Sequence, residues 1–161
     1  MAVINVTSGS QAILTLSNVD LAGAEPGATN GLVIPLLQDV SVSTQPGTVR
    51  YSTLDSTSSS AFTTVMENEI SFNMLLDEAT FFGLDSPGGV NSVTDNGLWS
   101  TSNSKSEIYF SIAFEGADSG DYFLKGQGFI GGLAPSASID QAVWISPGTI
   151  IVNGDLTKDT V

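Results

Sequence analysis

Apolar residues recur at every second position along most of this chain, and this period of two constrains the fold more than any other feature. The clearest stretch is SEIYFSIAFEG, residues 106–116, and ENEISFNML, residues 67–75, repeats the pattern. Because successive side chains of a β-strand point to opposite faces, such alternation predicts strands with one apolar and one polar face. The predicted apolar face carries Ile70, Phe72, Met74, Ile108, Phe110, Ile112 and Phe114, and the opposite face carries Glu67, Glu69, Ser71, Asn73, Glu107, Tyr109, Ser111, Ala113 and Glu115.

Shorter stretches with the same period predict more strands, and clusters of Gly, Pro, Asp and Asn predict the turns between them. SEIYFSIAFEG and the strand after it form a predicted hairpin, closed around Gly116–Gly120. The predicted fold class is mostly β, an antiparallel β-sandwich or partial barrel with one short helix. The other strands are expected at Ala2–Val6, Gln11–Ser17, Leu32–Ser43, Thr48–Leu54, Tyr122–Ile130 and Ala142–Val152, and the other turns at Gly23–Gly31, Gln45–Gly47, Asp85–Gly89 and Ala117–Gly120.

The one helix is expected at Asp77–Leu84, in the sequence DEATFFGL. The Asp77 side chain can cap its N-terminus, and the charge of Glu78 suits the positive end of the helix dipole. Gly83 lies near the expected end of the helix, where glycine is favoured. In the last long strand, Pro147-Gly148 predicts a bulge or kink.

The length and the charge of the chain limit the classes of protein to which it can belong. The chain has 161 residues, which suits a single domain spanning residues 1–161, and 41% of them are hydrophobic, which argues against global disorder. It carries 17 acidic and four basic residues, a formal net charge of −13. Because binding to a phosphate backbone needs clustered cations, we predict no tight binding to DNA or to an anionic membrane. An acidic surface is compatible with DNA that passes without adhering, but composition alone favours the simpler interpretation that the charge provides solubility.

The chain contains no Cys and no His. This excludes disulfides, Cys nucleophiles, His general bases and metal sites built from thiolates or imidazoles. The carboxylates of EGADSGD (Glu115, Asp118 and Asp121) lack the spacing of a calcium loop, so a solvated turn is favoured over a Ca²⁺ site. We therefore expect no metal and no cofactor. No basic segment followed by an apolar one opens the chain, so no signal peptide is expected.

GQGFIG, residues 126–131, matches the glycine pattern of a dinucleotide-binding loop. Such a loop needs a helix directly after it, whereas GLAPSAS follows here. We therefore interpret the glycines as a strand that another backbone approaches closely, or as a bulge. Because the chain also lacks a Ser elbow and a His base, we predict that it is not an enzyme.

Two polar stretches are candidates for interaction. The hydroxyl-rich segment around Ser56–Ser60 separates two predicted strands by more residues than a hairpin turn needs. It is either slack or a segment that becomes ordered on a neighbour. Trp99, in NGLWSTSNSK, lies in an expected polar loop, where a core role and an interface role are both open.

The order of these elements resembles that of the tail tube protein of long-tailed bacteriophages. The resemblance covers residues 40–156 and depends on two stretches, VRYSTLDSTSSSAFTTVMENEISFNMLLD (residues 49–77) and SKSEIYFSIAFEGADSGDYFLKGQGFIGGLAPSASIDQAVWISPGTIIVNGDL (residues 104–156). They share with that family a strand ending in a Thr-Leu-Asp-Ser step, a long polar loop at about residues 55–64, and an alternating strand led by an acid. A helix, a hairpin and a Gly-rich strand follow before a last strand that ends near VNGDL.

The resemblance implies a sandwich that closes into hexameric rings, with the rings stacked into an acidic tube that conducts DNA during ejection. It implies assembly with itself and with other tail proteins such as the tape measure, terminator and baseplate proteins, and DNA only in transit. The expected location is the virion tail, after assembly in the host cytoplasm. The implied lumen-facing residues are Glu67, Glu69, Ser71, Asn73, Glu107 and Glu115; the implied inter-ring loop is Asp55, Ser56, Thr57, Ser58, Ser59, Ser60 and Phe62; Trp99 is an interface candidate.

Other classes of β-rich protein fit parts of the same pattern. A phage head decoration protein or a tail adhesion module would share the sandwich and the acidity. A carbohydrate-binding module would use Trp99, Tyr109 or Tyr122 as a stacking platform. Stacked rings would separate the tube from both alternatives, since a closed trimer favours the first and a glycan-binding monomer favours the second.

Overall fold

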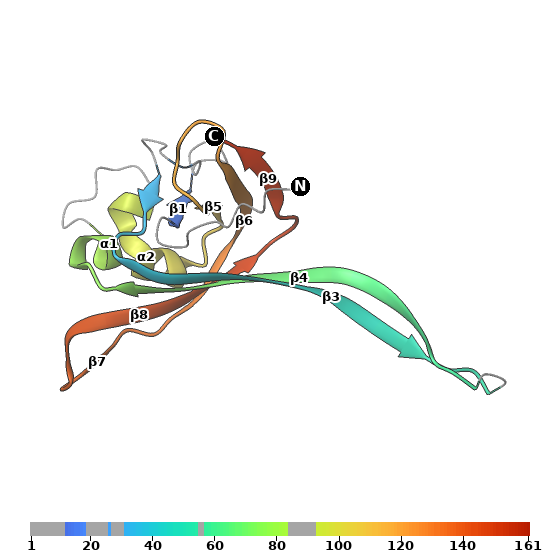
Figure 1. Ribbon diagram of the computed structural model, residues 1–161. Coiled ribbons are helices and arrows are strands. Elements are labelled where there is room, and N and C mark those ends of the chain that lie inside the picture. Colours follow the sequence, from blue (N-terminus) through green and yellow to red (C-terminus); the bar gives the residue numbers. More distant parts are fainter. Residues whose placement is uncertain (1–11, 19–25, 27–30, 55–56, 84–92) are drawn as a thin grey trace.

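The computed structural model describes residues 12–18, 26, 31–54, 57–83 and 93–161 (Figure 1). These residues form one nine-stranded antiparallel sheet and two helices, which confirms the predicted mostly β class. Along the described path the sheet stays open and does not close into a barrel. The elements are β1 Ile13–Ser17, β2 Leu32–Val33, β3 Leu37–Tyr51, β4 Ser60–Leu75, α1 Glu78–Phe82, α2 Val93–Ser104, β5 Ile108–Ala113, β6 Tyr122–Leu133, β7 Ser136–Ser138, β8 Gln141–Val152 and β9 Thr157–Thr160.

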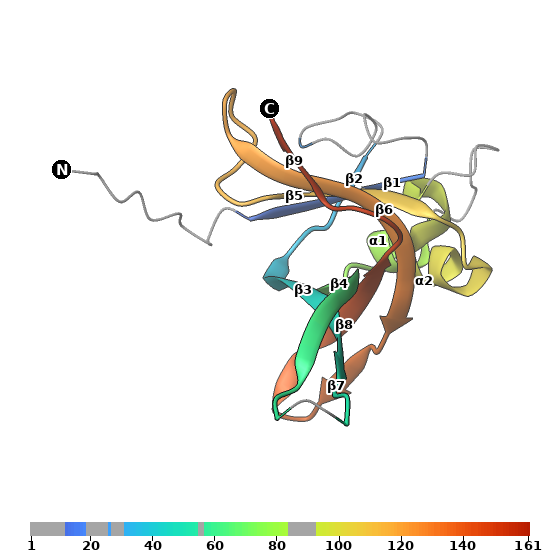
Figure 2. The same cartoon turned by 90° about the vertical axis from the view of Figure 1, so that its right-hand side faces the viewer.

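The strands lie in the order β2-β1-β5-β6-β8-β4-β3, with β7 paired to β8 and β9 paired to β6. Figure 2 shows β6 passing from an upper layer, with β1 and β5, into a lower layer, with β8 and β4. One continuous sheet therefore supplies both layers around the core. Burying each large core side chain contributes roughly 1.5–3 kcal/mol. The core comprises Leu14, Leu16, Ile34, Ile70, Phe72, Met74, Phe81, Val93, Leu98, Ile108, Phe110, Ile112, Ile130 and Ile150.

The predicted alternation along residues 67–75 and 106–116 holds for six of the seven side chains predicted to face the core. Ile70, Phe72 and Met74 of β4 are buried. The outward prediction is wrong for Ser111 and Ala113 of β5, which are fully buried. The physical reason is that β5 lies inside the sheet, between β1 and β6, and is covered along both faces. The apolar prediction is also wrong for Phe114, which follows the end of β5 and is exposed.

Strand β3 is longer than predicted. The sequence predicted two strands, Leu32–Ser43 and Thr48–Leu54, separated by a turn at Gln45–Gly47, but β3 runs without a turn from Leu37 to Tyr51. Pro46 is tolerated because β3 is paired only on its β4 side, and an edge strand can place a missing N–H toward solvent. The register with β4 shifts between Pro46 and Thr48, where two residues of β4 lie opposite Gly47, so the hairpin has a bulge here instead of a turn.

Helix α1 confirms the predicted helix and both of its ends. The Asp77 carboxylate accepts hydrogen bonds from the Thr80 backbone N–H (2.9 Å) and hydroxyl (2.8 Å). These bonds to the charged form lower the pKa of Asp77. Gly83 ends the helix at a φ of 84°, a conformation that favours glycine.

Helix α2 was not predicted, because its sequence was expected to form a loop. VTDNGLWSTSNS is poor in helix-favouring residues, and it is interrupted at Gly97, where φ is 72°. Burial of Val93, Leu98 and Thr101 against the sheet supplies the stability that local propensity does not. Tertiary packing therefore outweighs the local preference at this position.

The glycine-rich strand β6 confirms the predicted close backbone approach and bulge. Gly128 lies against the backbone of Ile151, and the register with β8 shifts between Ile130 and Gly132. Of the bulge or kink predicted at Pro147-Gly148, the bulge is wrong, because β8 keeps a regular register with β4 there. Gly148 makes room for the Phe72 ring. The hairpin around Gly116–Gly120 is confirmed, whereas β7 and β9 were not predicted. The predicted strand Ala2–Val6, the turn Asp85–Gly89 and most of the turn Gly23–Gly31 lie outside the described residues.

Candidate functional site: a polar sheet face and a projecting arm

The lower layer of the sheet has one face against the core and one face that no described element covers (Figure 1). Strands β3, β4 and β8 form this outer face, and their register aligns its side chains in rows. Adjacent rows lie two residues apart along each strand, because successive residues point to opposite faces. The rows are Asp39, Asn73 and Pro147; Ser41, Ser71 and Thr149; Ser43, Glu69 and Ile151; and Gln45 and Glu67.

The outer face is acidic and polar. It carries the carboxylates of Asp39, Glu67 and Glu69, and none of the residues in its described rows is basic. Asn73 donates a hydrogen bond through Nδ2 to Oε1 of Gln38 at 3.3 Å, which joins β4 to β3 on this side. An anionic polymer that moved across such a surface would meet like charge and no fixed cation.

The structure brings together four of the six residues predicted to line a lumen. Glu67, Glu69, Ser71 and Asn73 alternate along the outer face of β4. It does not bring Glu107 and Glu115 to this face, because two strands, β6 and β8, separate β5 from β4. Glu107 accepts a hydrogen bond from Asn153 Nδ2 at 2.9 Å, and Glu115 is exposed in the turn after β5. The sequence analysis missed Asp39, whose signal was the alternation of Asp39 with Val40 and Val42.

The β3–β4 hairpin forms an arm that projects far beyond the rest of the molecule (Figure 1). Strand β4 pairs with β8 only from Glu69 to Leu75. Its residues 60–68 pair with β3 alone, so the arm is two strands wide. At its bulge a Cβ on Gly47 would lie 2.1 Å from Oγ1 of Thr64, so the two strands approach closely. The predicted polar loop is therefore only the tip of a much longer ordered ribbon.

The end of the arm is apolar on one face. Val49, Tyr51 and Phe62 are exposed, and the Tyr51 and Phe62 rings lie 6.1 Å apart. Exposed apolar side chains of this size rarely cluster on a monomer without a partner. Of the predicted inter-ring residues, Thr57, Ser58 and Ser59 form the tip, Ser60 and Phe62 belong to β4, and Asp55 and Ser56 lie outside the described residues.

Trp99 lies on α2, with its ring 5.8 Å from that of the buried Phe81. It is 42% exposed, so its aromatic face is shared between the core and the surface. The three aromatic residues that a carbohydrate-binding module would use, Trp99, Tyr109 and Tyr122, lie on α2, on β5 and at the start of β6. Tyr122 is exposed, and Nζ of Lys158 lies 4.6 Å from the centroid of its ring.

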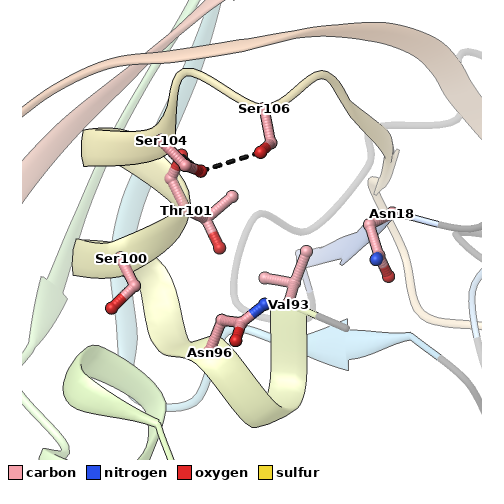
Figure 3. A pocket seen from close by; sticks show the side chains of 7 residues that line it. All are labelled: Asn18, Val93, Asn96, Ser100, Thr101, Ser104 and Ser106. Carbon is pink, nitrogen blue, oxygen red and sulfur yellow. Dashed lines mark hydrogen bonds between the residues drawn. The ribbon is translucent and has the colours of Figure 1, made fainter. Parts of the chain in front are cut away.

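A polar pocket of about 330 Å³ lies beside α2 (Figure 3). Three of its hydroxyl groups form hydrogen bonds within the protein: Thr101 donates to the Gly97 carbonyl at 2.8 Å, and the Ser104 and Ser106 hydroxyls lie 2.7 Å apart. None of the described residues that line it is titratable. The lining residues are Asn18, Val93, Asn96, Ser100, Thr101, Ser104 and Ser106.

Strand β9 pairs with the first residues of β6, Tyr122–Lys125. Lys125 donates a hydrogen bond through Nζ to Oδ2 of Asp159 at 2.5 Å, and this bond, together with the Thr160 backbone N–H, lowers the pKa of Asp159.

In the described part of the chain, no group of three or more carboxylates is arranged to hold a metal ion. Neither described helix is long and apolar enough to cross a membrane.

The fold defined by this sheet, arm and helix pair is that of tail tube proteins. No family model and no curated protein sequence matches the chain. Among solved structures, it is similar to a chain from the tail of an empty gene transfer agent particle with C6 symmetry, with a TM-score of 0.65, 15% identity, and coverage of 96% of this chain and 100% of that one. It is also similar to the SPP1 tail tube protein (TM-score 0.64, 9% identity, 97% of this chain and 80% of that one). A third similar chain comes from the sheath–tube complex of an extracellular contractile injection system, PVC (TM-score 0.59, 12% identity, 97% and 93%).

Proposed function

We propose that the chain is a structural subunit of a phage-type tail tube, with a structural and not a catalytic role. The observation that carries the proposal is the uncovered acidic face of β3, β4 and β8, whose opposite face is the core. In a tube this face would line the lumen, with Asp39, Glu67, Glu69, Ser71 and Asn73 contributed by each copy. The similarity of the whole fold to tail proteins supports this assignment.

Six copies would form each ring, by analogy with the C6 symmetry of the similar gene transfer agent tail. A ring would carry 6 × −13, or about −78 formal charges before screening by salt. DNA in transit would meet a like-charged wall, which prevents adhesion during ejection. The protein would then be located in the virion tail after assembly in the host cytoplasm, in contact with tape measure, terminator and baseplate proteins.

The free edge of the sheet gives a reason for ring formation. Strand β3 has 15 residues and, in the described chain, pairs on one side only. A long unpaired edge is a template for another strand, and proteins usually block such edges with charge or cover them. Here β3 carries two charged residues, Asp39 and Arg50, along its length. Pairing of this edge with a neighbouring copy would satisfy its backbone groups and continue the sheet around the lumen.

The arm gives a reason for stacking. In the proposed tube it would extend along the axis to the adjacent ring, with Thr57, Ser58, Ser59, Ser60 and Phe62 at the joint. Its exposed Tyr51 and Phe62 would be buried there. A tip with hydroxyl groups beside aromatic rings suits an interface, because it can stay soluble until a neighbour covers it.

Negative-stain electron microscopy of the concentrated protein, combined with size-exclusion chromatography, tests this function. The salt series should extend from about 0.01 M to about 1 M, over which the Debye length falls from about 30 Å to about 3 Å and repulsion between copies is screened. Rings or stacked tubes with an open bore are the expected result. A closed trimer, or a monomer that binds glycans, would contradict the proposal.

A further inference from the structure

We propose that the arm of one copy docks on the β7–β8 hairpin of a second copy in the next ring, with Arg50 paired to Asp140. This inference rests on the proposed tube and adds the acceptor surface and the residues that make the contact. It starts from the positions of the two hairpins. Figure 1 shows the arm and the β7–β8 turn at opposite ends of the lower layer.

The direction of the arm favours a contact between unlike surfaces. Figure 2, which looks along the arm, shows the arm and the β7–β8 turn together at the lower end of the molecule. A copy displaced along this direction therefore brings its β7–β8 turn to the arm tip of the copy behind it. Such a head-to-tail contact repeats from copy to copy, as a stacked assembly requires.

Both hairpin ends expose large apolar side chains. In the β7–β8 hairpin, Ile139 is fully exposed, and Val143 and Trp144 are 50% and 55% exposed. Val143 and Trp144 are adjacent in β8, so they present apolar groups on both faces of the hairpin. The arm offers Tyr51 and Phe62, and contact between the two ends would remove both apolar surfaces from water.

The distribution of charge along the chain favours a second copy of this chain as the occupant. Residues 44–66, which include the arm tip, contain one Arg and one Asp and are neutral. The remainder has 17 − 1 = 16 acids and 4 − 1 = 3 lysines, and so carries the full −13. Two bodies of that charge repel each other, whereas a neutral arm can approach a neighbouring body without that cost.

Arg50 is the only arginine of the chain, and among the described residues it makes no ion pair. It is exposed near the end of β3, opposite Ala61 of β4. Asp140 is exposed at the β7–β8 turn, next to Ile139. A guanidinium–carboxylate pair at this joint would fix the position of the arm, because its two parallel hydrogen bonds are directional.

Chemical cross-linking tests the contact, since the chain has no Cys of its own. The double variant A61C/A142C places one thiol on the arm and one on β8, both at exposed alanines. A short bis-maleimide is expected to give a ladder of dimers, trimers and larger species. Each single variant is expected to give no cross-linked species on a denaturing gel, because a head-to-tail contact brings unlike surfaces together. Efficient dimers from either single variant would overturn the proposal.

Electron microscopy of the same samples separates the two proposals. Tubes without a ladder would overturn the docking site and leave the tube intact. A ladder without rings or tubes would support the docking site and contradict the tube. Neither ladder nor tubes, under the salt series above, would contradict both.

Charge reversal then tests the ion pair itself. R50D and D140R should each raise the protein concentration at which tubes form by about fivefold, the upper end for one exposed ion pair. The double variant R50D/D140R should restore the original concentration. K105D, which makes the same charge change at another exposed cation, is the matched control and should have no such effect. Equal concentrations for wild type and both single variants would overturn the pairing of Arg50 with Asp140.

Discussion

Gly128 of β6 lies directly against the backbone of Ile151 in β8, and a Cβ at Gly128 would be 2.2 Å from the Ile151 carbonyl oxygen. Real side chains do not approach a backbone atom this closely. The space left by the missing side chain lets β6 and β8 pair in the lower layer. These two strands connect the acidic face to the upper layer of the sheet.

G128A should therefore force β6 and β8 apart. Overpacking of this kind typically costs about 1–3 kcal/mol of unfolding free energy. At about 2–4 °C per kcal/mol for a chain of this size, we expect a clear fall in the melting temperature by calorimetry. The matched control is G132A in the same strand, where a Cβ would make only an ordinary contact 3.8 Å from Oγ1 of Thr149. Equal melting temperatures for the two variants would contradict the role of Gly128.

Asp77 should stabilise helix α1 through its N-cap. Because D77A removes the acceptor for the Thr80 N–H and hydroxyl, it should cost about 1 kcal/mol, whereas D77N keeps a capping oxygen and should cost less. The measurement is chemical unfolding of the three proteins at neutral pH. A fall in stability as large for D77N as for D77A would show that the cap is not the cause.

The same cap predicts a pH dependence. The folded-state pKa of Asp77 is lowered by the two hydrogen bonds from Thr80. The contribution of the Asp77 cap to the free energy of unfolding is therefore complete above the ordinary Asp pKa of about 3.9, and it is lost as the pH falls through the lower folded-state pKa. The stability difference between wild type and D77A should narrow below about pH 3.9. A difference that stays constant through this range would contradict the charged cap.

The Lys125–Asp159 pair should hold β9 on β6. D159N removes the charge that Lys125 pairs with, so the amides of Thr157–Thr160 should exchange hydrogen faster while those of β5 and β6 change little. Because Asp159 has a lowered pKa, acidification below about pH 3.9 should loosen wild-type β9 in the same way. D155N, at an exposed acid just before β9, is the control. Unchanged exchange in D159N would mean that backbone pairing alone secures the strand.

The strands with one apolar face could be predicted from the sequence alone. Ile70, Phe72 and Met74 could be predicted because their alternation is the direct consequence of strand geometry. Ser111 and Ala113 could not, because burial of the second face of β5 depends on elements distant in sequence. Asp77 could be predicted from local chemistry, whereas α2 depends on packing against the sheet.

The candidate site shows the same division. The acids of β4 were predicted, since one strand determines their common face. The separation of Glu107 and Glu115 from that face was not, because the order of strands in a sheet is a property of the whole fold. The length of the arm was also missed, because Pro46 and Gly47 indicate a turn unless the strand is known to lie at an edge.

The acidic face of β4 should matter for DNA and not for folding. E67K and E69K change exposed side chains, so each should alter the unfolding free energy by no more than about 0.5 kcal/mol. In a six-membered ring the double variant would change the charge by 2 × 2 × 6 = 24 units. Tubes of E67K/E69K should therefore still form but should retain double-stranded DNA at low salt, and release it as salt is raised.

E115K, which replaces one acid by lysine in the turn after β5, is the control for a general loss of negative charge. DNA retention equal in E115K and E69K tubes would show that β4 has no special relation to the path of DNA, whereas retention confined to the β4 variants would support its position on the lumen.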